Sequence, residues 1–132
     1  MNIVIDYEPT AKGMPRTDLI KGHVITHFSH KTQYALDDIR EMIACQHYPQ
    51  FPPHIPIKLV ATFHRTKSKW LPKREKQPFR KPDLDNFLKL CLDCISPLIV
   101  PDDAQITSIA ARKVWSANGH GYIEIELEED TP

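Results

Sequence analysis

Residues 81–95 read Lys-Pro-Asp-Leu-Asp-Asn-Phe-Leu-Lys-Leu-Cys-Leu-Asp-Cys-Ile, and this stretch holds the clearest helix signal in the chain. Apolar residues recur at helical spacing between positions 84 and 95, which predicts a helix over that range. Asp83 precedes it as a natural N-cap, and Pro82 helps to set the entry. The helix is the element around which the rest of the chain is organised.

Strands are predicted on both sides of this helix. Apolar and β-branched residues alternate in four segments, which are residues 2–7, 55–64, 105–115 and 121–128. Gly119 lies in the turn-rich stretch 116–121 and predicts that the last two strands pair as a hairpin. Trp115 and Tyr122 flank that turn and are expected to pack across it.

A second helix is predicted over residues 31–47, with Ser29 as its N-cap. Residues 8–30 are predicted to be a long loop, with residues 24–28 able to form a short strand within it. The predicted order is strand, helix, strand, helix, strand, strand. This order indicates one domain over residues 1–132, of the α/β class in its α+β form, with a small mixed sheet and two main helices.

Charge is distributed unevenly along a chain whose formal net charge is zero. One stretch, residues 65–81, carries eight basic residues against a single acid: Arg65, Lys67, Lys69, Lys73, Arg74, Lys76, Arg80 and Lys81. Prolines interrupt it, so we interpret it as a mobile loop, with Trp70 or Phe79 available to stack on an unpaired base. A merely solvated charged loop would have the same composition. The chain ends in a short acidic tail at residues 129–132.

Cysteine content and hydropathy indicate the expected cellular location of the protein. Three cysteines and the lack of a recognisable signal peptide predict a reducing, cytoplasmic location. No apolar run approaches the roughly 18 residues needed to span a bilayer, so we expect no membrane segment. Cys91 and Cys94 lie in the predicted helix without a second ligand pair, which favours packing over zinc. His23, His27 and His30 are expected to contact phosphate rather than metal.

Acidic residues cluster around the central helix. Asp83 and Asp85 lie at its start, and Asp102 and Asp103 precede the next strand. If that strand begins beside the start of the helix, three carboxylates meet, and they could hold a hard cation such as Mg²⁺ for phosphodiester hydrolysis. The same residues also fit ordinary roles, namely a helix cap, a loop and a surface ion pair between Asp85 and Lys89.

A family resemblance follows from three segments of the chain. They are Lys81-Pro82-Asp83-Leu84-Asp85-Asn86 with Lys89 and Asp93, then Asp102-Asp103-Ala104-Gln105-Ile106, and the N-terminal residues 8–16. Together they resemble the signature of the RusA family of Holliday-junction resolvases. The match covers most of the chain, although Met14 stands where a basic residue is expected.

The resemblance implies a homodimeric crossover junction endodeoxyribonuclease that depends on Mg²⁺, or on Mn²⁺. Such enzymes resolve four-way DNA junctions by paired symmetric nicks, in recombination, repair or phage DNA processing. Asp83, Asp85 and Asp103 would match the catalytic, metal-binding carboxylates, with Asp102 as the second choice. Lys89 would match the essential lysine of the same helix.

Predicted partners are branched DNA and a second copy of the chain, because two symmetric nicks need two active sites. The expected DNA contacts are Lys12, Arg16, Lys67, Lys69, Lys73, Arg74, Lys76, Arg80 and Lys81. Residues 98–100 are apolar and are candidates for the dimer interface.

Two other functions fit the same residues. One is a metal-dependent nuclease that acts on other branched or single-stranded nucleic acid. The other is a non-catalytic protein that binds DNA structures, in which the acids only start a helix. The extended basic loop disfavours a small-molecule phosphohydrolase. Cleavage preference, the number of metal ions and the dimer interface stay open at this point.

Overall fold

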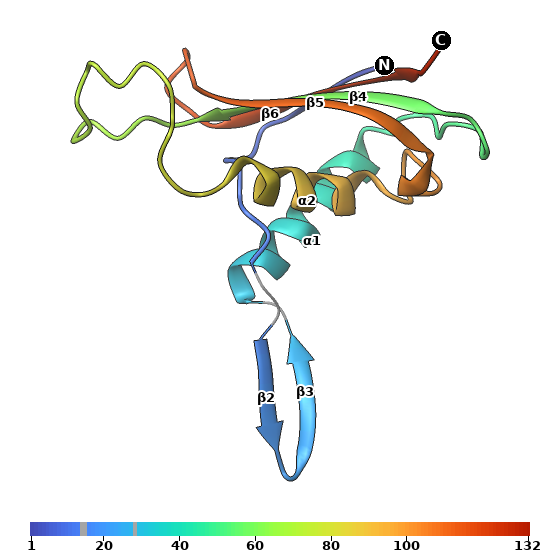
Figure 1. The fold of residues 1–132 in the computed structure, drawn as a ribbon, viewed down its shortest axis with the longest axis horizontal. Coiled ribbons are helices and arrows are strands. Elements are labelled where there is room, and N and C mark those ends of the chain that lie inside the picture. Colours follow the sequence, from blue (N-terminus) through green and yellow to red (C-terminus); the bar gives the residue numbers. More distant parts are fainter. Residues whose placement is uncertain (14–15, 28) are drawn as a thin grey trace.

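The computed structural model describes residues 1–13, 16–27 and 29–132, without the side chains of Arg16 and His27. Its element order is β1 (Asn2–Ile5), β2 (Arg16–Ile20), β3 (His23–His27), α1 (His30–Cys45), β4 (Ile57–Arg65), α2 (Leu84–Ile95), η1 (Asp103–Gln105), β5 (Ile106–Trp115) and β6 (Tyr122–Glu129). Four strands form a mixed sheet in the order β1-β6-β4-β5, and both helices cover one of its faces (Figure 1). The predicted α+β class, with a small mixed sheet and two helices, is confirmed.

The predicted hairpin between the last two strands is wrong, because β4 lies between β5 and β6. It pairs in parallel with β5 and antiparallel with β6. β4 takes the central position because its inward side chains are the most completely buried of the sheet; Leu59 and Ala61 are 0% exposed. The parallel pairing of β4 and β5 requires a long crossover connection, and α2 provides it.

The aromatic residues at the ends of β5 and β6 consequently do not pack on each other as predicted. Tyr122 stacks on His64 of β4, with ring centroids 3.9 Å apart. Trp115 instead donates its indole N–H to the backbone carbonyl of Glu75, at 2.9 Å. Tyr122 therefore contacts β4, and Trp115 contacts the basic loop.

Residues 8–30 contain more regular structure than the predicted loop. β2 and β3 pair antiparallel from Arg16↔His27 to Ile20↔His23. Lys21 and Gly22 form the two-residue turn, with φ of 50° and 80°, as a type I′ hairpin requires. The hairpin projects away from the sheet and helices, like an arm (Figure 1).

Packing of α2 against the sheet builds much of the core. The Phe87 ring lies 5.5 Å from the Phe63 ring of β4, between centroids. Cys91 and Cys94 are 2% and 0% exposed. Burial raises the pKa of Cys94 to about 12, so the thiol is protonated at neutral pH. The packing role predicted for both cysteines is confirmed.

The segment after α2 is also part of the core. Ile99 and Val100 are 1% and 0% exposed, so the suggestion that they form a dimer interface is wrong. Leu98, by contrast, is 41% exposed. Within the described residues, no helix is both long enough and apolar enough to cross a membrane.

Candidate active site

Asp83 is the N-cap residue of α2, but its carboxylate does not cap the helix. The backbone carbonyl of Asp83 accepts from the N–H groups of Asn86 and Phe87, at 3.1 and 3.4 Å. Its side chain makes no capping hydrogen bond, is 53% exposed and forms an ion pair with Lys81 at 3.2 Å. Helix capping therefore does not account for this carboxylate, which stays available to a ligand.

Asp85 and Lys89 follow on one flank of α2. The Lys89 ammonium lies 3.5 Å from the Asp85 carboxylate, and both side chains are at least 60% exposed. Asp93, one turn beyond Lys89 on the same stripe, is engaged within the chain, because it pairs with Lys12 at 2.6 Å and its carbonyl accepts from Arg40 of α1.

Two cations that sequence reasoning missed hold the backbone that enters α2. Lys113 of β5 donates to the carbonyls of Arg80 and Pro82, at 2.9 and 2.8 Å. Arg65 of β4 donates to the carbonyl of Lys81 at 3.4 Å. Burial, and then the nearby Arg65 charge, lower the pKa of Lys113. We infer that these contacts position Asp83.

Lys113 had a detectable signal in the sequence. In β5 it shares the alternation of Ile109 and Ala111, whose partners Leu59 and Ala61 on β4 face the helices. A lysine in an inward position of a strand usually has a specific partner, because burying an unpaired charge is costly.

Asp102 and Asp103 lie at η1, before β5. Asp102 accepts from the N–H of Ala104 at 2.9 Å, and Gln105 accepts from the N–H of Asp102 at 3.2 Å, which completes a capping box. The Gln105 amide also donates to the carbonyls of Pro52 and Ile55, before β4 begins. Because Asp102 has this structural role, Asp103 is the better candidate ligand of the two.

One chain does not bring the two groups of acids together. Asp83 lies where β4 and β5 end, whereas Asp103 lies where they begin, and α2 between these two ends is about 18 Å long (Figure 1). Among the residues that the structure describes, no three acidic, histidine or cysteine side chains gather around a point that could hold a metal ion. The sequence analysis required β5 to begin beside the start of α2 for three carboxylates to meet. Within one chain, β5 does not begin there.

The chemistry of the donors nevertheless suits Mg²⁺. Asp83 and Asp85 present exposed carboxylate oxygens, and Mg²⁺ in proteins is commonly held by one or two carboxylates together with water. The two residues alone could therefore hold a hydrated cation, and one further carboxylate would complete the set predicted from the sequence.

The basic loop is folded around a buried glutamate, unlike the mobile loop expected from the sequence. Glu75 is 8% exposed, and the Arg80 guanidinium donates to both of its carboxylate oxygens. Lys67 and Trp115 both donate to the backbone carbonyl of Glu75, at 2.9 Å. Lys67 and Arg80 are therefore engaged within the loop.

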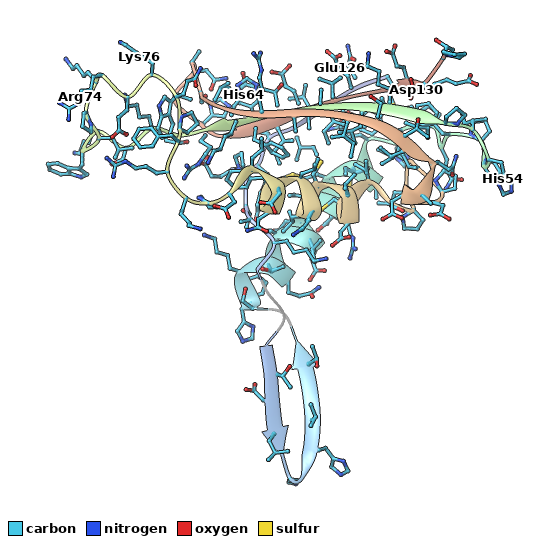
Figure 2. All side chains as sticks on the ribbon, in the orientation of Figure 1. His54, His64, Arg74, Lys76, Glu126 and Asp130 are labelled. Atoms are coloured by element: carbon cyan, nitrogen blue, oxygen red, sulfur yellow. The ribbon has the colours of Figure 1, made fainter. Side chains whose placement is uncertain are left out.

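The remaining predicted DNA contacts of the loop are on its surface. Lys69, Lys73, Arg74, Lys76 and Lys81 are exposed, and Arg74 lies at the far end of the loop from the body (Figure 2). Trp70 and Phe79 are also exposed, by 84% and 72%. The side chain of Arg16 lies outside the described part of the structure.

A hollow adjoins the start of α2. It has a volume of about 480 Å³ and lies between the N-terminal segment, the start of α1 and Pro82. Glu8, Lys31 and Arg65 line it. Lys12 closes the segment onto α2, because its N–H donates to the carbonyl of Asn86 at 3.0 Å. The N-terminal segment is thus part of the surroundings of Asp83.

The Glu75–Arg80 pair gives the loop a pH dependence. The hydrogen bond from Arg80 lowers the pKa of Glu75 below its ordinary value of 4.5. The stabilisation that this pair gives to the loop is therefore complete above pH 4.5 and is lost as the pH falls through the lowered pKa.

We expect Glu75→Gln to speed tryptic cleavage within residues 66–81 at pH 7 on the order of tenfold, because the charged hydrogen bonds are lost. Unchanged cleavage, with Glu41→Gln as control, would contradict this role.

The sequence profile of Endodeoxyribonuclease RusA matches residues 6–128, which include both groups of acids and the basic loop. The chain belongs to the RusA endodeoxyribonuclease family. The resemblance noted in the sequence is thereby confirmed. One relative is the uncharacterized protein YqaN of Bacillus subtilis (strain 168), which is 29% identical over 132 residues, covering 92% of this chain and 91% of its own length.

Proposed function

We propose that this protein is a Mg²⁺-dependent endodeoxyribonuclease that resolves four-way DNA junctions as a homodimer, by paired symmetric nicks. Its role would lie in recombination, repair or phage DNA processing. One observation carries the proposal. In a member of an endodeoxyribonuclease family, the exposed carboxylates of Asp83 and Asp85 lie with Lys89 where an exposed basic loop ends.

The separation of the acids supports a dimer. Asp103 lies at the end of the sheet opposite Asp83 and Asp85, so a site that uses all three needs two chains. Two copies related by a twofold axis, with their α2 helices antiparallel, place Asp103 of each copy near the start of α2 in the other. This arrangement creates two equivalent sites, one for each strand to be nicked.

The proposed chemistry is in-line attack of water on a junction phosphate. Asp83 and Asp85 hold the cation from one chain and Asp103 from the other, while Lys113 and Arg65 keep the start of α2 in place. When bound, Mg²⁺ supplies positive charge to the phosphate and makes the attacking water more acidic. Lys89 neutralises negative charge that develops in the transition state, or orients the water.

The exposed cations of residues 69–81 would contact the phosphates that flank the cut. Their contribution is largely independent of sequence and falls with added salt. Trp70 and Phe79, both exposed, would stack on bases that are unpaired at the branch point.

A nicking assay on an end-labelled synthetic junction tests this function. Wild-type protein is expected to cut opposing strands at paired sites, only with Mg²⁺ or Mn²⁺, and to leave a linear duplex of the same sequence intact. Asp85→Asn should abolish cutting, whereas Asp37→Asn, an exposed aspartate of α1, should not. Equal cutting of flaps or single strands would favour a broader nuclease, and tight binding without cutting would favour a structure-binding protein.

A further inference from the structure

Two cations line the hollow beside the start of α2, and neither is neutralised by an acid. Lys31, in the first turn of α1, and Arg65, at the end of β4, border this space of about 480 Å³. Within the described residues, no ion pair joins either side chain to a carboxylate. The Arg65 guanidinium lies 5.7 Å from the ring centroids of both Phe87 and Trp115, which hold it against the body of the protein.

Positive charge is also concentrated on the backbone that borders the hollow. Pro82 lines the hollow, and its carbonyl accepts from Lys113 at 2.8 Å. Burial, and then repulsion from Arg65, lower the pKa of Lys113. Asp83 has the opposite effect on this pKa, but its carboxylate is paired with Lys81. An anion bound in the hollow would reduce the repulsion between these cations.

Glu8 is the one acid among the described residues that line the hollow, and it is engaged elsewhere. Its two carboxylate oxygens accept from the N–H and the hydroxyl of Thr66, at 3.0 and 2.9 Å. The carboxylate lies against Gly121, where a Cβ atom would come within 1.6 Å of one of its oxygens. Glu8 is therefore fixed toward the basic loop and does not neutralise Lys31 or Arg65.

The other wall of the hollow is apolar and held in place. It includes Pro9 and Ala11 of the N-terminal segment. The backbone of this segment is tied at two points, because the N–H of Lys12 donates to the carbonyl of Asn86 and the N–H of Gly13 donates to the hydroxyl of Thr32. A space with cations on one side and carbon atoms on the other matches a phosphate attached to a sugar.

We propose that this hollow binds a backbone phosphate of the DNA strand that is cut, with its deoxyribose against the apolar wall. The proposal rests on the proposed function and adds a contact that this function does not use. Lys31 and Arg65 contact the phosphate oxygens. Because Pro82 directly precedes Asp83, the bound phosphate lies close to the one that is cut. Such a contact positions the strand without reading its sequence.

The salt dependence of DNA binding tests this contact. Binding of an end-labelled four-way junction is measured without Mg²⁺, so no cutting is needed. Lys31→Ala should lower the slope of log K against log salt by about one, the value for one lost phosphate contact. Lys31 is exposed, so its loss should leave the fold intact. Lys58→Ala, which removes a lysine paired with Glu128 on the sheet, is the control and should leave the slope unchanged.

Uncharged phosphates locate the contact on the DNA. A single methylphosphonate is placed in turn at each phosphate around the branch point. At one position it should weaken binding of the wild-type protein and have no further effect on the Lys31→Ala protein, since the contact is already lost. Lys73→Ala, which removes an exposed lysine of the basic loop, should keep the full effect at that position.

The outcomes separate the phosphate site from the function. An unchanged salt slope for Lys31→Ala overturns the site, as does a methylphosphonate effect that equals the wild-type effect at every position. If the slope falls as expected but the wild-type protein cuts no junction with Mg²⁺, the site stands and the proposed function fails alone. If the protein cuts junctions and the slope is unchanged, only the site fails. A protein that binds no DNA overturns both.

Discussion

Mixing two inactive variants, Asp85→Asn and Asp103→Asn, is expected to restore nicking of a four-way junction. If each site takes Asp85 from one chain and Asp103 from the other, a mixed dimer has one site with both substitutions and one site with neither. The intact site can cut. Each variant alone contains only damaged sites, so it should stay inactive.

The size of the recovery follows from counting sites. With free exchange in an equal mixture, about half of the dimers are mixed and one of their two sites is intact, which gives about a quarter of the wild-type sites. Mixed dimers should leave single nicks rather than paired ones. Denaturing gels of a junction labelled on all strands would distinguish the two products.

A matched mixture provides the control. Asp83→Asn with Asp85→Asn should not recover, because both residues lie at the same end of α2 and every mixed dimer then has two damaged sites. If Asp85→Asn with Asp103→Asn also fails to recover, although labelled subunits are shown to exchange, the site is not shared between chains.

Lys89→Ala is expected to slow nicking by about 100- to 1000-fold, the range typical for removing one group that stabilises transition-state charge. The Lys89 ammonium lies 3.5 Å from the Asp85 carboxylate and is 60% exposed, so its loss should not destabilise the fold. Single-turnover rates at saturating protein would measure the chemical step apart from binding.

The expected pattern is a loss of rate with little loss of junction affinity. Lys58→Ala removes a lysine of the sheet that is 45% exposed and lies 3.9 Å from Glu128, and it should leave the rate unchanged. If Lys89→Ala weakened binding in proportion to the rate, Lys89 would be a DNA contact rather than part of the chemistry.

Local signals in the sequence predicted most of the secondary structure. The spacing of apolar residues located α2 at residues 84–95, and Ser29 was correctly identified as the cap of α1, since its hydroxyl accepts from the N–H of Thr32. The order of strands could not be obtained this way. Residues 116–121 look like a hairpin turn, but β4, whose inward side chains are fully buried, lies between β5 and β6.

The candidate site shows the same division. The candidate residues were proposed from their types, their spacing and the family resemblance. Their separation could not be predicted, because it depends on the direction in which β5 runs relative to α2. The basic loop was expected to be mobile, because its long-range contacts are not visible in the sequence. The Glu75–Arg80 pair and the indole of Trp115, which comes from a distant strand, hold this loop. Such long-range contacts leave no periodic signal.

The sequence of the β2–β3 hairpin can change without affecting the rest of the fold. Its apolar residues, such as Leu19 and Val24, are at least 70% exposed and add nothing to the core. Substitutions there alter the arm without lowering the stability of the sheet and helices. Evolution can therefore vary what the arm touches while the folding of the body stays constant, and relatives can acquire new preferences at this position without compensating changes elsewhere.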